Sequence, residues 1–122
     1  MMKSVVLLSI VKSMVLMLLC FLSPVNTYSD TAKSTISGDT GFGISVDMDD
    51  SYMVVGADQS NKALVYAYSS AYNTWGTTAD TTFNAPDNVN SFGQSVGIDG
   101  NNVIVGASAS GSAFIFEYSS SA

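Results

Sequence analysis

An internal repeat is the feature that most constrains how this chain can fold. The segments 42–70 and 92–120 align over 29 positions without a gap, at an offset of 50 residues, and 13 of the aligned pairs are identical. Self-similarity at such a period is typical of arrays in which each repeat is one supersecondary unit stacked on the next. We therefore expect two copies of one small unit rather than a single irregular domain.

Each copy has the pattern of short β-strands. Val46 and Met48 alternate with polar residues, and the turn-forming residues 49–51 separate them from the apolar run 53–55. The second copy repeats this order and carries its apolar run at 103–105. Because these two runs are apolar on both faces, we expect each of them to be covered on both sides.

The next strand of each copy has one bulky and one slim face. In the first copy the large residues are Leu64, Tyr66 and Tyr68, and the alternating small residues are Ala63, Val65 and Ala67; the large residues of the second copy are Phe114, Phe116 and Tyr118. A Thr-rich region at 73–83, which contains Trp75, supplies a fourth strand. Four short strands in about 50 residues is the size of a propeller blade.

The motif order in both copies resembles the FG-GAP repeat, the unit of the β-propeller in integrin α chains and in many secreted proteins. The matching residues are Phe42, Gly43, Phe92 and Gly93 for FG, and Gly56, Ala57, Gly106 and Ala107 for the GA of GAP. Asp58 and Ser108 replace the proline of the third GAP position, so the match is not complete. The likeness covers about residues 40–118 and implies eight structural motif residues.

The predicted fold is all-β: a partial β-propeller with one complete and one incomplete four-stranded antiparallel blade, after an N-terminal signal helix. Blade 1 is expected at about 40–89 and the partial blade 2 at about 90–122, within a repeat region at 30–122. Closed propellers contain about 4–8 blades, so the chain is interpreted as truncated to about two blades. We therefore expect self-association or further blades, with the large residues Phe114, Phe116 and Tyr118 exposed because no third blade follows.

Asp47, Asp49 and Asp50 form the only acidic cluster that suggests a metal. Many integrin-type repeats carry a calcium loop between their first two strands, and this cluster has the corresponding position. Calcium needs six to eight oxygen ligands from a loop that curls around the ion, whereas about three residues separate the strands here. We expect a solvated hairpin turn and no cofactor, with calcium as the alternative.

The first 29 residues have the pattern of a signal peptide. Lys3 is followed by apolar residues up to Leu22, and small residues at Thr27 and Ser29 match a cleavage site. Lys12 interrupts the apolar run, which disfavours a permanent membrane span. We expect a cleaved signal and a secreted or cell-surface protein; an uncleaved signal anchor, which would attach the chain to the membrane, is the alternative.

Composition excludes several classes of function. After Ser29 the chain has ten acidic residues against two lysines, a net charge of −8, and the sequence has no arginine. Nucleic-acid binding needs clustered basic residues, so no nucleic-acid partner is expected. The chain also has no histidine, and its one cysteine is Cys20. Serine–histidine and cysteine–histidine catalytic devices and the usual zinc ligands are thereby missing from the repeats.

Two acidic residues, Asp58 and Glu117, could form a glycosidase-like carboxylate pair, but nothing in the sequence indicates a shared pocket for them. No catalytic residue is assigned, and the chain is predicted to be non-enzymatic. The expected function is an extracellular binding or adhesion module that acts as a scaffold for a protein or glycan ligand. The alternative is a truncated fragment or paralogue of a larger propeller, including an enzyme whose catalytic residues lie in missing blades, without a function of its own.

Overall fold

The computed structural model describes residues 27–119. The predicted signal peptide, residues 1–29, lies outside the described residues apart from its last three positions. The chain divides into two units, 1–31 and 32–122, and the fold described below belongs to the second. In the described part of the chain, no helix has the length and apolar character needed to cross a membrane.

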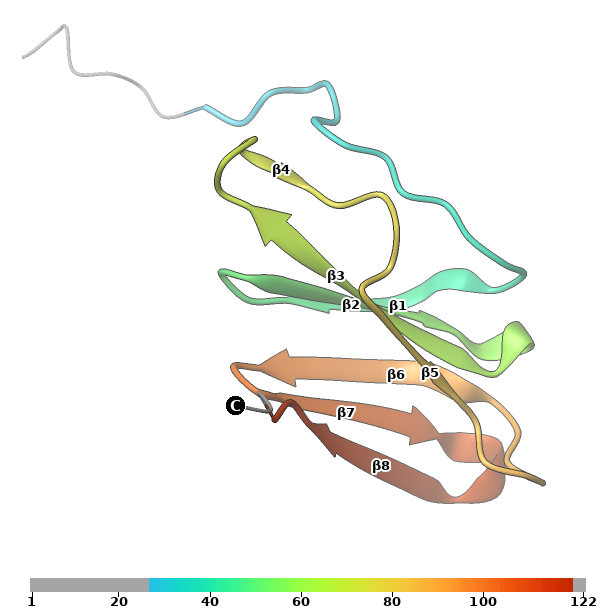
Figure 1. The fold of residues 1–122 in the computed structure, drawn as a ribbon. Coiled ribbons are helices and arrows are strands. Elements are labelled where there is room, and N and C mark those ends of the chain that lie inside the picture. The colour runs from blue at the N-terminus through green and yellow to red at the C-terminus, as the bar shows by residue number, and fades with distance from the viewer. Residues whose placement is uncertain (1–26, 120–122) are drawn as a thin grey trace, which may run out of the picture. The chain divides into compact units, whose positions relative to one another are not determined.

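The second unit consists of two antiparallel sheets that stack face to face (Figure 1). Sheet 1 contains the strands β1 (Phe42–Met48), β2 (Tyr52–Ala57), β3 (Lys62–Ser69), β4 (Thr74–Trp75) and β5 (Thr81–Asn84). Sheet 2 contains β6 (Phe92–Asp99), β7 (Asn102–Ala107) and β8 (Ser112–Glu117). Two 3₁₀ turns, η1 (Asp58–Ser60) and η2 (Ser108–Ser110), join the second and third strands of each sheet. The prediction of an all-β partial propeller fold is confirmed, and we call the sheets blade 1 and blade 2.

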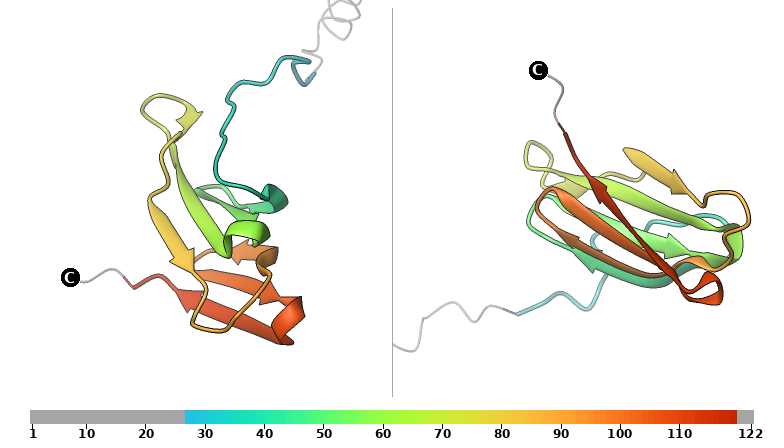
Figure 2. Two further views of the ribbon diagram at one scale, coloured as in Figure 1. Left: turned by 90° about the vertical axis from the view of Figure 1, so that its right-hand side faces the viewer. Right: turned by 90° about the horizontal axis from the view of Figure 1, so that it is seen from below.

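The expected fourth strand of blade 1 is present in two pieces. Both β4 and β5 pair with β3: β4 lies beside Tyr68 and Ser69, and β5 lies beside the segment 62–65. After this interruption, β5 descends from blade 1 toward blade 2, as the views in Figures 1 and 2 agree. There the ring of Phe83 stacks on that of Phe116, with centroids 4.0 Å apart. The outer strand of blade 1 thus also covers the last strand of blade 2.

The FG motif marks an irregularity at the start of each blade. The pairing register shifts between Phe42 and Ser45 in β1, and at the corresponding place in β6. Gly43 and Gly93 have φ angles of +88° and +92° there, a region that is open to glycine and costly for other residues. The glycine of FG is therefore required by the backbone of this bulge.

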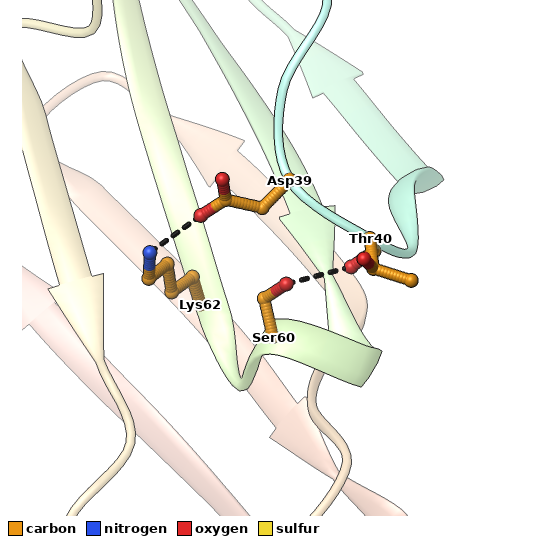
Figure 3. Close-up of polar contacts among 4 residues, drawn as sticks. All are labelled: Asp39, Thr40, Ser60 and Lys62. Carbon is orange, nitrogen blue, oxygen red and sulfur yellow. Dashed lines mark hydrogen bonds and ion pairs between the residues drawn. The ribbon is translucent and has the colours of Figure 1, made fainter.

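The turn between the second and third strands anchors the chain that leads into each blade. Ser60 donates a hydrogen bond to the carbonyl oxygen of Thr40 at 2.8 Å, and Ser110 donates to that of Asn90 at 3.4 Å. In blade 1, Lys62 also pairs with Asp39 at 2.5 Å (Figure 3). Equivalent serines thus make the equivalent hydrogen bond in the two copies, as expected for a structural repeat.

The core lies between the blades and is formed by opposite kinds of face. Blade 1 contributes its slim face, which includes Val54, Ala63 and Val65, and blade 2 contributes its bulky face, which includes Val103 and Val105. Both faces follow from strict alternation, because neighbouring residues of a strand point to opposite sides. The two sheets are therefore stacked in the same sense along the repeat, bulky face against slim face.

This polarity corrects two expectations. Phe114 and Phe116 are not exposed: they pack against the core from the bulky face of blade 2, and only Tyr118 is exposed, at 61%. The large apolar residues exposed on blade 2 are Ile104 and Ile115, at 47% and 73%. The expectation failed because the bulky face of blade 2 turns back toward blade 1. For the same reason, the apolar run at 103–105 is covered on one side only.

Candidate functional site

A groove of about 500 Å³ lies between the blades at the end that carries the turn from β6 to β7. Its floor is apolar and is formed by core residues from both blades, including Val65, Val103 and Phe116. Its rim carries hydrogen-bonding groups from four different segments: Tyr52, Asp80, Thr81, Asn101, Glu117 and Tyr118. An apolar concavity with a few convergent polar groups is the usual form of a ligand site.

Two tyrosines from different blades meet at this groove. The rings of Tyr52 and Tyr118 lie with their centroids 6.4 Å apart and their planes at 38°. Tyr118 is held through its backbone, because its N–H donates to the carbonyl oxygen of Asn101 at 2.7 Å. Its side chain remains largely exposed, so the ring offers a face and a hydroxyl to a ligand.

The charged side chains of the groove are carboxylates. Asp80 accepts a hydrogen bond from the backbone N–H of Ala67 through Oδ2 at 2.9 Å, and its own N–H donates to Val65 at 2.8 Å. Glu117 adds a second, exposed carboxylate. The basic residues of the described part are Lys33 and Lys62, and neither lines the groove. The groove therefore offers hydrogen-bond acceptors and negative charge.

Two of the three calcium candidates, Asp47 and Asp49, accept hydrogen bonds from backbone N–H groups. Asp49 accepts hydrogen bonds from the N–H groups of Ser51 and Tyr52, both at 2.7 Å. These bonds stabilise the charged carboxylate, so the pKa of Asp49 lies below its ordinary value of 3.8. Asp47 reaches across to blade 2 and accepts from the N–H of Ile98 at 2.8 Å.

Asp47, in β1, and Asp49, in the turn between β1 and β2, thus have their carboxylates hydrogen-bonded to backbone N–H groups, whereas Asp50 is exposed. Over residues 27–119, no three acidic, cysteine or histidine side chains gather as metal ligands would. The preference for a hairpin turn over a calcium loop remains a prediction that a titration with calcium can test.

The two carboxylates considered for catalysis lie at opposite ends of the strands. Asp58 begins η1, directly after the end of β2. Glu117 ends β8, where it pairs with Asn102 at the start of β7. The segment that includes Asp58 lies beside the start of β6, where Asn61 accepts from the N–H of Phe92, whereas Glu117 lies at the other end. The structure does not bring this pair together.

The aromatic residues divide between packing and exposure. Tyr66 is buried on the outer face of blade 1, and this burial raises its pKa. Tyr68 and Trp75 pack against each other with ring centroids 5.3 Å apart. Phe114 and Phe116 pack against the core, where Phe116 also forms part of the groove floor, and Tyr118 is the exposed member of this set at the groove rim.

The sequence did not point to the groove as a site. Its rim residues come from four segments that alternation alone does not place together, and Asp80 stood in a Thr-rich region without a motif. The one available signal was Tyr118, which ends the bulky face of the second copy.

Comparison with known proteins adds no relative. No protein-family model matches the chain, and neither the curated proteins nor the solved structures include a significant match.

Proposed function

We propose that the chain is a non-enzymatic, extracellular binding module whose ligand surface is the groove between its two blades. The single observation that carries this proposal is the groove itself, which combines an apolar floor with tyrosines and hydrogen-bonding groups from both blades. The resemblance to the FG-GAP repeat and the signal-like N-terminus support the extracellular setting.

The rim chemistry suits a ligand that stacks on an aromatic ring and donates hydrogen bonds. Tyr52 and Tyr118 provide ring faces, and Asp80 and Glu117 provide carboxylate acceptors. Sugar rings and peptide segments that carry amide or ammonium donors both fit this description. A glycan or protein ligand is therefore consistent with the groove, and an anionic ligand is disfavoured by its two carboxylates.

A binding screen tests the proposal. The exported form of the full chain is probed against immobilised neutral oligosaccharides and against short basic peptides. We expect one class to bind, and Tyr118→Ala to weaken that binding by roughly tenfold or more, in line with the loss of a central aromatic contact.

Tyr72→Ala is the matched control, since Tyr72 is also an exposed tyrosine, at 83% against 61% for Tyr118, and lies outside the groove. Equal weakening by both substitutions, or binding by neither class of probe, would show that the groove is not the ligand surface.

A further inference from the structure

The contact between the blades depends on a close approach of two backbones. Ser45 donates a hydrogen bond through Oγ to the carbonyl oxygen of Gly93 at 2.8 Å. A Cβ atom placed on Gly56 would collide with this same oxygen, and one placed on Gly93 would collide with the carbonyl oxygen of Lys62. The glycines of FG and GA are therefore the two halves of one interface: the FG glycine of blade 2 lies on the GA glycine of blade 1.

Both halves of this interface are repeated on the outer faces, against which no further blade lies in the described chain. The bulky face of blade 1 is bordered by residues 34–36, and its Val55 and Tyr66 are buried. Gly43 of blade 1 has nearly the same φ as Gly93, yet a Cβ atom placed on it would have no neighbour within 4 Å. Gly106 of blade 2 corresponds to Gly56, and a Cβ atom there would meet Ser95 alone. The outer faces thus carry the same close-approach positions as the inner ones.

The outer faces also expose apolar side chains. On the bulky face of blade 1, Val46 and Met48 are 64% and 53% exposed. They correspond by repeat to Val96 and Ile98, which pack against the core between the blades. On the slim face of blade 2, Ile104 and Ile115 are exposed, and they correspond to the buried residues Val54 and Val65. The exposed apolar positions of each outer face therefore repeat positions that are packed on an inner face.

The backbone N–H at the start of each blade has a different hydrogen-bond acceptor in the two blades, and this difference is compatible with contact between the outer faces. In blade 2 the N–H of Phe92 needs Asn61 of blade 1 as its acceptor. In blade 1 the N–H of Phe42 donates to the backbone carbonyl oxygen of Asp39, in the same chain, at 3.0 Å. The residue equivalent to Asn61 in blade 2 is Gly111, which has no side chain to offer. When the slim face of blade 2 of another chain docks on blade 1, the N–H of Phe42 would therefore keep its acceptor, the carbonyl oxygen of Asp39, and would not need a side chain at the position of Gly111.

We propose that the outer faces bind each other between chains, so that the slim face of blade 2 in one copy docks on the bulky face of blade 1 in a second copy. The occupant is a second copy of this chain because the chain itself presents the slim face that the bulky face fits. The contact is heterologous, since two different surfaces meet, and its repetition generates a ring or an open stack. Closed propellers hold about 4–8 blades, which corresponds to about two to four chains. This inference uses the outer faces and is independent of the groove.

A mixing experiment tests the polarity of the contact directly. Val46→Asp places a charge on the bulky outer face, and Ile115→Asp places one on the slim outer face; both positions are exposed, so the fold should persist. By sedimentation velocity of the exported full chain, we expect wild type to be a multimer and each variant to be a monomer. An equimolar mixture of the variants should form a dimer, since each chain keeps the face that the other has lost. Tyr72→Asp, which adds the same charge elsewhere, should assemble like wild type.

A second comparison separates assembly from folding. Gly106→Ala should yield a monomer with an unchanged circular dichroism spectrum, because the atom nearest to its Cβ would be the hydroxyl oxygen of Ser95, which can rotate away. Gly56→Ala should weaken the fold itself, because its Cβ would collide with the backbone carbonyl oxygen of Gly93, which cannot. Gly76→Ala should alter neither property, since a Cβ atom there would have 3.5 Å to its nearest neighbour. A monomeric wild type, or variants that assemble alone or fail to pair when mixed, would overturn the proposal.

Discussion

At the residue scale, a few glycine and aspartate residues determine how closely the backbone packs and how its N–H groups are paired. Gly56 and Gly93 allow the backbones of the two blades to approach until a carbonyl oxygen replaces a side chain between them. Asp49 has the corresponding role within a turn, because its carboxylate holds two backbone N–H groups that the hairpin would otherwise leave unpaired. In both cases a single residue either makes room for the backbone or accepts its hydrogen bonds.

The turn at Asp49 predicts a pH-dependent stability. The folded-state pKa is lowered by the hydrogen bonds from Ser51 and Tyr52, so the stabilisation is present above the unfolded-state pKa and is lost as pH falls through the folded-state value. Asp49→Ala should therefore lower the free energy of unfolding at neutral pH by about 0.5–1 kcal/mol, a modest amount because solvent screens an exposed carboxylate. Urea denaturation at neutral pH and below about pH 4 should show the difference between variant and wild type shrinking in acid.

The neighbouring Asp50→Ala is the control for this experiment, because Asp50 is exposed and its carboxylate accepts no hydrogen bond from the described residues. A cost of the Asp49 substitution that is independent of pH would contradict the role given to its charge.

At the scale of elements, the strands and turns were predictable and the stacking direction was not. The repeat, the alternation around Val46 and the turn at 49–51 indicated each strand, because these signals are local. Alternation defines a bulky and a slim face, but it does not say which of them turns toward the neighbouring blade. That choice depends on the bulge after each FG and on the descent of β5, which are tertiary features. The exposure expected for Phe114 and Phe116 failed for this reason, and the groove was missed because its rim is assembled by the same stacking.

The descent of β5 leads to a prediction of its own. Because the ring of Phe83 stacks on Phe116 across the two blades, Phe83→Ala should lower the free energy of unfolding by about 2–3 kcal/mol, somewhat less than for a fully buried phenylalanine. Thr82→Ala, on the exposed side of the same strand, should change it by less than about 0.5 kcal/mol. Chemical denaturation of the exported chain measures both values. Similar effects of the two substitutions would show that β5 does not couple the blades.

At the scale of the whole molecule, the inner contact and the proposed outer contact have the same geometry. In each, the bulky face of one blade packs on the slim face of another, and an FG glycine lies against a GA glycine. Each chain carries the groove between its blades, so the proposed assembly would display several such grooves in one particle. Such multivalent display raises the overall affinity for a repetitive ligand without any new contact. The binding function and the assembly would then reinforce each other, although each has its own test.

The bulky face of blade 2 packs on the slim face of blade 1, and this contact organises the whole unit. A nuclear Overhauser spectrum of the full chain, with labelled phenylalanine rings and isoleucine methyl groups, tests this most directly. The structure predicts cross-peaks between the rings of Phe83 and Phe116, whose centroids lie 4.0 Å apart, and none between Phe83 and the methyl groups of Ile115, which is exposed on the opposite face. Cross-peaks from Ile115 to Phe83, with none from Phe116, would show that blade 2 is turned the other way and would contradict the account.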